Sequence, residues 1–441
     1  MQTAIVWLRN DLRVTDNRTL TEALKQYNWV IPVYIFDPRH YRTSTYGFAK
    51  IGPHRANFIV ACVQAMRHAL QNLGSNLIVR QGNASTLLKK LCKEYSASAV
   101  YYSKEVAPEE TKEEQELIES LQALGVRTYA VENTLLLEQD KLPFSCSHMP
   151  DVFTQFRIQV ERQGIHVSPL SKPRQIHTPL GIPEGLIPSE APFFYNNINA
   201  TSNNISFQFK GGEQEALNHL HNYVWEKNGP AHYFETRNQL WGNDYSTKLS
   251  AWLAQGALSA RSVWSTIKEY EASRVANKST YWIGFELLWR DFFRLSMEQY
   301  KSNLFFIQGP KRRAISYEWN PEIFWTWVNG QTEDAFINAC MNELRCTGYL
   351  SNRGRQVCAS YLVHDLNSNW LMGAAYFESM LIDYDVSSNY GNWAYIAGVG
   401  NDPRIDRVFN VAKQAATYDP DGAYRQLWAN KTNTNVEGDR D

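Results

Sequence analysis

The chain has 441 residues, of which 44% are hydrophobic and 20% charged, a balance typical of a globular protein of two or three domains. Its formal net charge of −1 argues against a generally basic nucleic-acid-binding protein, although a local basic groove remains compatible with it. The six cysteines show neither a CxxC pair nor zinc spacing, and no apolar run is long enough to span a membrane, so we expect no metal site and a cytoplasmic protein without a signal peptide.

Residues 1–132 alternate short apolar runs with amphipathic helical stretches. Strands are predicted at 3–8, 29–36, 76–79, 99–102 and 127–131. Helices are predicted at 16–27, 57–73, 84–95 and 109–124, with Asp16 or Thr19 as the cap of the first. This alternation predicts an α/β domain with a doubly wound parallel sheet. Neither a GxGxxG fingerprint nor a P-loop occurs, so the usual phosphate-binding signature of such domains is missing.

The remainder of the chain predicts a long linker and then an all-α domain. Residues 133–212 lose the alternation and are rich in proline, asparagine, serine and glycine, so we expect an interdomain linker with a short helix near 152–163. From 213 to 430 the hydrophobic period is helical throughout, and 431–441 form a short polar tail. Helices are predicted near 213–227, 250–254, 260–270, 280–300, 321–329, 332–344, 352–366 and 372–382.

The stretch from Leu381 to Tyr395 is unusually dense in polar side chains. Asp383 and Asp385 are two residues apart, Asn389 follows four later, and Trp393 lies four beyond that. Gly391 lies between the last two, where the backbone can approach a ligand closely. An Asx-rich loop between helices would explain these residues taken alone. The motifs upstream are what favour a ligand site.

A second cluster, at residues 245–250, combines hydroxyl groups with a lysine just before an apolar helix. Tyr245, Ser246, Thr247 and Lys248 precede Leu249, and Ser250 is the expected N-cap. Hydroxyls, a cation and free N–H groups at a helix start suit an anion, although plain capping is the commoner reason for such residues. Upstream, Tyr233 and Arg237 add an aromatic ring and another cation.

Residues 281–294 predict a helix in which Glu286 and Arg290 lie four apart on one face, as do Trp289 and Phe293. One interpretation is an ion pair beside a core stripe, and the other is a carboxylate and an indole that face a ligand pocket.

Residues 352–356 begin another predicted helix, in which Asn352 and Gln356 share a face. Both amides can hydrogen-bond a base edge. Basic residues nearby could track phosphates, although charged runs are more often solvated surface: Lys311, Arg312, Arg313, Arg345, Arg353 and Arg355.

Together these motifs resemble the photolyase and cryptochrome family, and most closely its cryptochrome DASH branch. The resemblance extends over nearly the whole chain, from Val6-Trp-Leu-Arg-Asn-Asp-Leu-Arg13 to Gly400-Asn-Asp-Pro-Arg404, and is most specific at 285–291, 351–356 and 383–393. It implies an N-terminal α/β antenna domain and a C-terminal helical domain that holds FAD, in agreement with the domains predicted above.

The resemblance also implies positions around FAD. Arg353 and Asp383 would form an ion pair beside the isoalloxazine ring, Asp385 would contact the ring, and Asn389 would lie near its N5. An amide at that point adds no charge and should tolerate an anionic reduced flavin. The remaining expected contacts are Tyr233, Tyr245, Ser246, Thr247, Lys248, Leu249, Ser250, Glu286 and Arg290.

The activity that the resemblance implies is blue-light-driven, FAD-dependent repair of cyclobutane pyrimidine dimers. Glu286 would hydrogen-bond the extruded dimer, Trp289 would stack on it, Asn352 would share the pocket, and Asn389 would act beside the flavin. Arg355 is assigned to DNA contact.

Two positions depart from the enzymes that act on duplex DNA. Gln356 stands where they carry methionine, and Tyr395 where they carry a second tryptophan. Both changes reduce stacking area, which matters least when the dimer lies in single-stranded DNA, so a preference for single strands is expected.

The resemblance further implies an electron path and an antenna. Trp393 and Trp370 match the first two of three tryptophans used for photoreduction. The third position aligns with Tyr317, and we expect the nearby Trp319 to be the last carrier instead. The antenna would be 5,10-methenyltetrahydrofolate, with Glu109 as the expected ligand and Glu105 or Glu110 as alternatives.

We therefore expect a single-strand-preferring pyrimidine-dimer lyase, present as a monomer or weak dimer, with damaged single-stranded DNA as its partner, RNA as a further candidate ligand and no membrane. The alternative is a blue-light receptor that signals through a partner and repairs little. A third possibility is a nucleic-acid-binding flavoprotein with no photochemical role.

Overall fold

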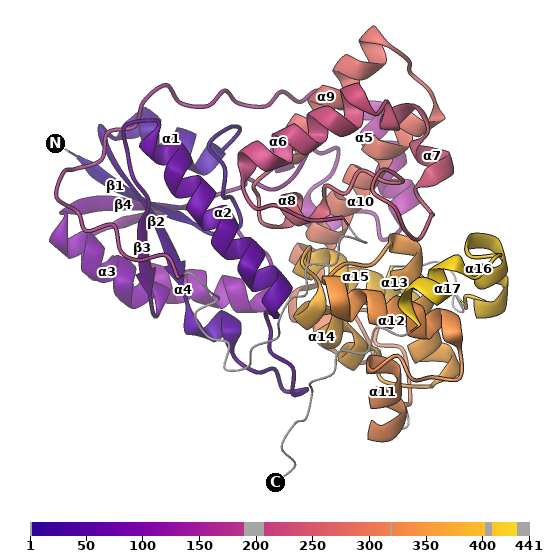
Figure 1. Cartoon of the computed structure of the whole chain (residues 1–441). Coiled ribbons are helices and arrows are strands. Elements are labelled where there is room, and N and C mark those ends of the chain that lie inside the picture. Colours follow the sequence, from indigo (N-terminus) through magenta and orange to yellow (C-terminus); the bar gives the residue numbers. More distant parts are fainter. Residues whose placement is uncertain (1, 189–206, 318–319, 402–407, 430–441) are drawn as a thin grey trace.

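The computed structural model describes residues 2–188, 207–317, 320–401 and 408–429 (Figure 1). The strands are β1 (Thr3–Leu8), β2 (Trp29–Phe36), β3 (Ile78–Gln81), β4 (Ala97–Ser103) and β5 (Arg127–Val131). The helices of the first part are α1 (Arg18–Gln26), α2 (Pro53–Gln71), α3 (Ala84–Glu94), α4 (Pro108–Gln122) and α5 (Phe153–Gln163). Those of the second part are α6 (Glu213–His221), α7 (Tyr233–Thr236), α8 (Ser250–Ala254), α9 (Ala260–Ser273), α10 (Lys278–Tyr300), α11 (Pro321–Val328), α12 (Ala335–Thr347), α13 (Asn352–Ser360), α14 (Trp370–Met380), α15 (Val386–Ile396), α16 (Val411–Tyr418) and α17 (Ala423–Trp428).

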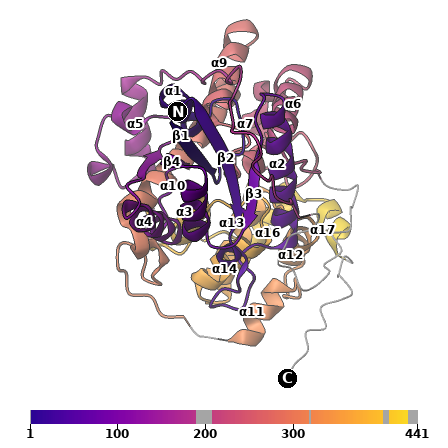
Figure 2. The same ribbon diagram turned by 90° about the vertical axis from the view of Figure 1, so that its left-hand side faces the viewer.

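The five strands form one parallel sheet in the order β3-β2-β1-β4-β5, which confirms the predicted α/β fold. β1 is buried at every residue, as expected for a strand with helices on both faces. Its alternate side chains belong to two hydrophobic clusters, one with α1 and α2 and the other with α3 and α4. These two pairs of helices cover opposite faces of the sheet (Figures 1 and 2). The strand order reverses between β1 and β4, and ligands of open α/β sheets bind beyond the carboxyl ends of strands at such a point.

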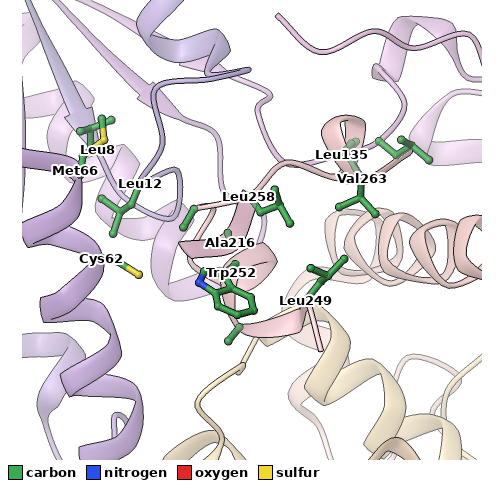
Figure 3. Close-up of a cluster of buried hydrophobic side chains, with 14 of the residues drawn as sticks. Leu8, Leu12, Cys62, Met66, Leu135, Ala216, Leu249, Trp252, Leu258 and Val263 are labelled. Atoms are coloured by element: carbon green, nitrogen blue, oxygen red, sulfur yellow. The ribbon is translucent and has the colours of Figure 1, made fainter. Parts of the chain in front are cut away.

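The helical part has two hydrophobic cores. The first includes residues of α6 to α10 and is continuous with the α1–α2 face of the sheet (Figure 3). In it, Leu8 and Met66 belong to the same buried cluster as Trp252 and Val263, so the α/β domain and these helices share one core. The second core is built by α11 to α17. In Figure 1, α8 and α10 lie above α13 and α15, at the junction of these two groups of helices.

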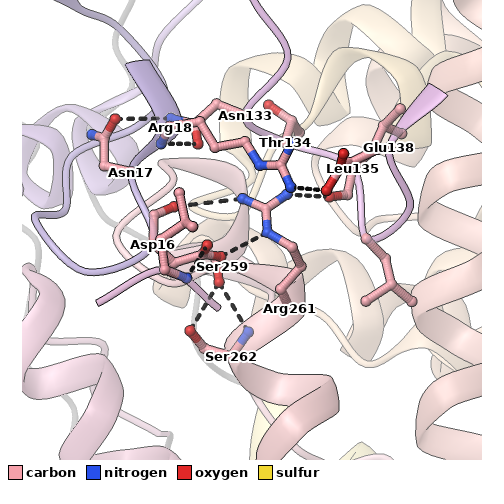
Figure 4. Close-up of polar contacts among 12 residues, drawn as sticks. Asp16, Asn17, Arg18, Asn133, Thr134, Leu135, Glu138, Ser259, Arg261 and Ser262 are labelled. Atoms are coloured by element: carbon pink, nitrogen blue, oxygen red, sulfur yellow. Dashed lines mark hydrogen bonds and ion pairs between the residues drawn. The ribbon is translucent and has the colours of Figure 1, made fainter. Parts of the chain in front are cut away.

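A buried ion pair joins the β1–α1 connection to α9 (Figure 4). Nε of Arg261 donates to Oδ2 of Asp16 at 2.9 Å, and the two side chains are only 2% and 0% exposed. Arg261 also donates to the Leu135 carbonyl at 2.8 Å, while Oδ1 of Asp16 accepts the Leu170 N–H at 2.9 Å. The pair therefore holds four segments together in a place that water does not reach.

The start of α2 docks against the helical part through a close backbone approach at Gly52. The Gly52 N–H donates to the Ser379 carbonyl at 2.8 Å, and a Cβ at Gly52 would lie 2.3 Å from that oxygen. Any side chain at this position would push the two parts of the molecule apart. Two residues later, Nε2 of His54 bonds the Arg345 carbonyl at 3.1 Å.

Several local predictions were wrong. The cap of α1 is Asn17, which accepts the Leu20 N–H, because Asp16 is engaged by Arg261. Ser250 is the first residue of α8 rather than its N-cap, and Leu249, which makes no side-chain capping bond, occupies the cap. Residues 386–396 are helical rather than a connecting loop, and Asp385 caps them by accepting the Ser388 N–H at 2.7 Å.

In the portions of the chain that the structure describes, no helix combines the length and apolar character needed to cross a membrane.

Candidate active site

Glu286 lies in the middle of α10, which begins with a capping box between Asn277 and Thr280. Trp282 is one turn earlier on the same face, and its indole Nε1 donates to Oε1 of Glu286 at 3.0 Å. Nη1 of Arg237 donates to the same oxygen at 2.8 Å. Among the described residues, none donates a hydrogen bond to the other oxygen, Oε2. The carboxylate is thus held through one oxygen and can offer the second to a ligand.

The position of Arg237 is set by α7 and by two aromatic rings. α7 is attached to the start of α10, because the Phe234 N–H donates to Oγ of Ser279 at 3.1 Å. The Arg237 guanidinium lies 4.9 Å from the centroid of the Trp282 ring and 5.8 Å from that of Phe234. Burial raises the pKa of Glu286, while the charge of Arg237 and the Trp282 N–H oppose that rise. Arg237 therefore favours the ionised carboxylate.

Arg290 does not pair with Glu286, so the interpretation of these two residues as an ion pair within α10 is wrong. Its guanidinium donates instead to the carbonyls of Thr134 at 2.7 Å and Leu253 at 3.3 Å. These bonds hold α10 against the segment that follows β5 and against α8.

Aromatic rings line α10 next to Glu286. Trp289 stacks on Phe153 of α5, with centroids 3.7 Å apart, and meets Tyr395 of α15 edge-on at 5.9 Å. Gly391 makes this approach of α15 to α10 possible, because a Cβ there would lie 2.3 Å from the Phe293 ring. The close approach expected at Gly391 is therefore to a neighbouring helix rather than to a ligand. The structure brings together two of the expected dimer-pocket residues, Trp289 and Tyr395.

The two amides expected in the same pocket come from the first turns of α13. Asn352 is exposed and Gln356 half-buried. In the described part of the chain, no hydrogen bond links either side chain to Glu286 or Trp289. α13 packs against α15, the helix that carries Tyr395.

The ion pair expected between Arg353 and Asp383 is formed by Arg355 instead. Nη2 of Arg355 donates to both oxygens of Asp383, at 3.0 and 2.8 Å. Arg353 is two residues earlier on α13 and points elsewhere, because its guanidinium donates to Asn238 and lies 5.2 Å from the centroid of Tyr418. Side chains two apart on a helix face different directions, so only one of the two arginines can reach Asp383.

Lys248 is a buried cation in the run that was expected to contact FAD. Its ammonium lies 3.8 Å from the centroid of Tyr245 and 4.4 Å from that of Tyr349. Burial lowers the pKa of Lys248 to about 7, although the carboxylates of Glu343 and Asp383 oppose the shift. Burial likewise raises the pKa of Glu343 to about 7. A ligand with negative charge would therefore stabilise the ammonium form of Lys248.

The neighbours of Lys248 are placed as a group around it. The Thr247 carbonyl is bonded by His219 at 2.8 Å, and Leu249 is buried. Among the residues expected at the cofactor, Tyr233 begins α7, Ser250 begins α8, and five lie in the connection between these helices: Tyr245, Ser246, Thr247, Lys248 and Leu249. On α15, the Asn389 amide donates to the Ala374 carbonyl of α14 at 3.0 Å, which fixes the orientation of its oxygen.

A cavity of about 750 Å³ lies between the α/β domain and the helical part. It opens beyond the ends of β1 and β4, at the point where the strand order reverses, and its other wall includes Arg290, Asp385 and Tyr390. The cavity therefore connects the place of the expected antenna with a residue of the expected flavin site.

The three glutamates that could bind the antenna all line this cavity, but they differ in their partners and in their burial. Glu109 is bound by Lys50 and by Arg42, and its side chain is 58% exposed. Glu105 is buried and receives Nη1 of Arg294 at 3.0 Å. Partial burial and the neighbouring Glu105 raise the pKa of Glu110 to about 7. Of the three, Glu110 has the carboxyl group best able to share a proton with a ligand.

The expected electron carriers are unequally placed. Trp393 and Trp370 are both buried, and Nε1 of Trp370 donates to the Ile307 carbonyl at 2.9 Å. Tyr317 is partly buried at the edge of the second core. Trp319 lies outside the described residues.

Some residues of the site were missed from the sequence. The indole of Trp282 could have been found, since it precedes Glu286 by one helical turn. Tyr349 and Glu343 could not, because their contacts with Lys248 join segments about a hundred residues apart.

The chain matches two sequence models that describe one family. The model of DNA photolyase matches residues 4–174, and the model of the FAD binding domain of DNA photolyase matches residues 282–436.

Relatives match over nearly the full chain. A protein of Gloeobacter violaceus named cryptochrome DASH is 44% identical over 427 residues, which are 97% of this chain and 85% of that protein. The crystal structure of a Synechocystis cryptochrome is 41% identical, with a TM-score of 0.93 over 97% of this chain and 88% of that one. A class III photolyase of Agrobacterium tumefaciens is 25% identical, with a TM-score of 0.85 over 97% and 86% of the two chains.

Proposed function

The chain belongs to the photolyase and cryptochrome family, in its cryptochrome DASH branch, and we propose that it splits cyclobutane pyrimidine dimers in single-stranded DNA under blue light. The observation that carries the proposal is the state of Glu286. Its carboxylate is bound through one oxygen by Arg237 and Trp282, and no described residue donates to the other oxygen. Trp289, which meets Tyr395 edge-on, follows Glu286 by one helical turn on α10. This arrangement suits a flat polar ligand that both stacks on a ring and donates N–H groups.

FAD is the cofactor, and the donor set fits it. The buried ammonium of Lys248, with hydroxyls on either side, suits the diphosphate, and a diphosphate would in turn raise its pKa from about 7. The Arg355–Asp383 pair and the Asn389 amide supply charged and neutral hydrogen-bonding groups for the ring system. Oγ of Ser387, in the first turn of α15, is buried and lacks a protein partner among the described residues, as expected of a wall that faces a polar ligand.

Bound and reduced, FAD would supply light-driven one-electron chemistry for the splitting of the dimer. The chain itself binds the dimer, orients it and excludes water. Trp289 provides a rigid face for stacking, because Phe153 and Tyr395 hold it from two sides. Oε2 of Glu286 accepts hydrogen bonds from N–H groups of the pyrimidines, and Arg237 favours the ionised form of the carboxylate.

We expect strong repair of single strands and weak repair of intact duplex. Gln356 and Tyr395 offer less stacking than methionine and tryptophan would, and stacking contributes about 1–3 kcal/mol per base. A dimer in a single strand needs little of that energy for extrusion, whereas a paired dimer must also leave the stack. The measurement is the initial repair rate on one oligonucleotide presented as a single strand, an intact duplex and a mismatched bubble. The bubble should restore the rate, and equal rates on duplex and single strand would contradict the role of these two residues.

We also propose that the interdomain cavity binds a reduced-folate antenna, with Glu110 as its main carboxylate contact. The cavity lies at the sheet position where α/β domains bind ligands, and one wall reaches Asp385 beside the expected flavin. The purified protein should therefore show flavin absorption together with a separate near-UV folate band. Glu110→Gln should weaken only the folate band, because Glu110 lies outside the flavin site. A Glu109→Gln variant, in which an exposed ion pair is lost, serves as the control. Loss of the folate band in the Glu109 variant alone would restore Glu109 as the ligand.

A further inference from the structure

A second buried tryptophan, Trp327, touches the tryptophan expected nearest the flavin. The rings of Trp393 and Trp327 have centroids 6.3 Å apart at an interplanar angle of 78°. Phe377 packs against both, at 5.1 Å from Trp393 and 6.1 Å from Trp327. Nε1 of Trp327 donates to the Cys358 carbonyl at 3.2 Å. A carbonyl oxygen at the indole N–H stabilises positive charge on that ring.

From Trp327 the aromatic contacts continue along α11 to the surface. Phe324 lies 5.9 Å from Trp327 and 6.0 Å from Trp325, measured between ring centroids. The Phe48 ring lies 5.5 Å from Trp325 and 6.0 Å from Phe324. Trp327 is 0% exposed, whereas Trp325 is 45% exposed. Helix α11 lies at the edge of the molecule (Figure 1). This short helix thus carries one indole in the core and one that is partly in solvent.

Among the described residues, the last carrier of the expected route through Trp370 is a tyrosine, which is less suited than an indole to hold a positive charge. Tyr317 occupies the aligned last position, and its hydroxyl is buried with no hydrogen-bond partner among the described residues. A tyrosine that loses an electron must also lose its phenolic proton, and no described residue accepts a hydrogen bond from this hydroxyl. Burial also raises the pKa of Tyr317, so the proton is held more firmly than usual.

We propose that Trp327 and Trp325 form a second route by which oxidising equivalents leave Trp393 for the surface. The inference rests on the proposed function, in which photoexcited oxidised flavin is the oxidant that takes one electron from Trp393. One electron then passes from Trp327 to Trp393 and one from Trp325 to Trp327, with no bond formed or broken. A thiol or dihydronicotinamide in solution returns one electron to Trp325.

The direction of transfer follows from solvation. A positive charge costs much less in water than in an apolar core, so a hole is more stable on the exposed Trp325 than on the buried Trp327. Phe324 and Phe48 are too hard to oxidise to hold the charge, and they serve as the packed medium through which the electron tunnels. Indoles need no proton acceptor to carry the charge for a short time, which is the advantage of this exit over Tyr317.

The test uses the FAD-loaded protein with Trp325→Phe and Trp327→Phe. Trp241→Phe is the matched control, because Trp241 is 49% exposed and lies outside the aromatic series. After a blue flash, the lifetime of the tryptophan radical should fall by about tenfold or more in both variants and stay unchanged in the control, a change that corresponds to about 1.4 kcal/mol or more in the barrier to charge return. Under prolonged light in air without reductant, peptide mass spectrometry should find oxygenated Trp325, and Trp327→Phe should remove that product.

The possible outcomes distinguish a failure of the proposed electron route from a failure of the proposed function. If the wild type forms the radical but Trp325→Phe leaves its lifetime unchanged, the route is wrong and the proposed function stands. Oxygenation of Trp325 that persists in Trp327→Phe would mean attack from solvent and would also overturn the route. If the wild type binds no flavin or forms no radical, the proposed function and the route fail together. Because Trp325 is exposed, its phenylalanine variant tests the route even if the buried variant folds poorly.

Discussion

Glu286→Ala is expected to keep FAD bound and to lose most dimer repair. The substitution removes the carboxylate oxygen of Glu286 to which no described residue donates, and it leaves the contacts of Lys248, Arg355 and Asn389 in place. A hydrogen bond to a charged group contributes about 1.5–3 kcal/mol, so the repair efficiency at low substrate should fall about ten- to a hundredfold. The measurement compares repair rates of the pre-reduced variant and wild type under the same light, normalised to flavin absorbance.

Two matched variants identify what Glu286 contributes. Glu286→Gln keeps the shape and loses the charge, so an intermediate loss would assign the effect to charge. Arg237→Gln removes the cation that opposes the burial effect, so the pKa of Glu286 should rise further. As the pH is lowered, Glu286 then becomes protonated at a higher pH than in the wild type. The acid limb of the pH profile of repair should therefore shift to higher pH. Full repair by Glu286→Ala would show that the Glu286 carboxylate does not take part in repair. So would a pH profile of Arg237→Gln with its acid limb at the same pH as in the wild type.

The second large effect is on stability, at the buried pair of Arg261 and Asp16. Arg261→Ala leaves the Asp16 carboxylate without its cation and the Leu135 carbonyl without its donor, in a place where both side chains are nearly inaccessible to water. Removal of one partner of a buried pair costs about 3–5 kcal/mol. The FAD-loaded variant should therefore unfold at a clearly lower urea concentration than the wild type.

Lys268→Ala on the same helix is the control for this stability prediction. Its ion pair with Glu271 is exposed on the lysine side and contributes about 0.5 kcal/mol or less. Arg261→Met combined with Asp16→Asn should recover part of the loss, because no unpaired charge is then buried. A midpoint for Arg261→Ala equal to that of Lys268→Ala would show that the pair does not hold the two parts together.

The fold could be predicted from periodicity because its elements are local. The strands at 3–8, 29–36 and 127–131 appear with the predicted bounds, and the helices deviate mostly at their ends. Helix α15 was obscured by its composition, since Asp, Ser and Asn also suit loops, and only the Asp385 cap distinguishes the two.

The sequence predicted which residues gather at the site, but it did not predict which arginine pairs with which carboxylate. Arg353 and Arg355 flank one glycine, and which of them faces Asp383 depends on the rotation of α13, set by its cap at Ser351. The partner of Glu286 likewise proved to be Arg237, from a different helix, rather than Arg290 on its own. Long-range pairing of this kind is a property of packing, which the hydrophobic pattern of a single helix does not contain.

The most direct test of the proposed repair activity is the loss of the dimer in the light. A single-stranded oligonucleotide with one cyclobutane thymine dimer is mixed with the FAD-loaded, chemically reduced protein, and one half is kept dark while the other receives blue light. Chromatography of the oligonucleotide then measures the dimer that remains. Conversion to undamaged thymines is expected only in the illuminated half, with many turnovers per flavin. An unchanged dimer in the light, with reduced flavin present throughout, would contradict it and favour a blue-light receptor that repairs little.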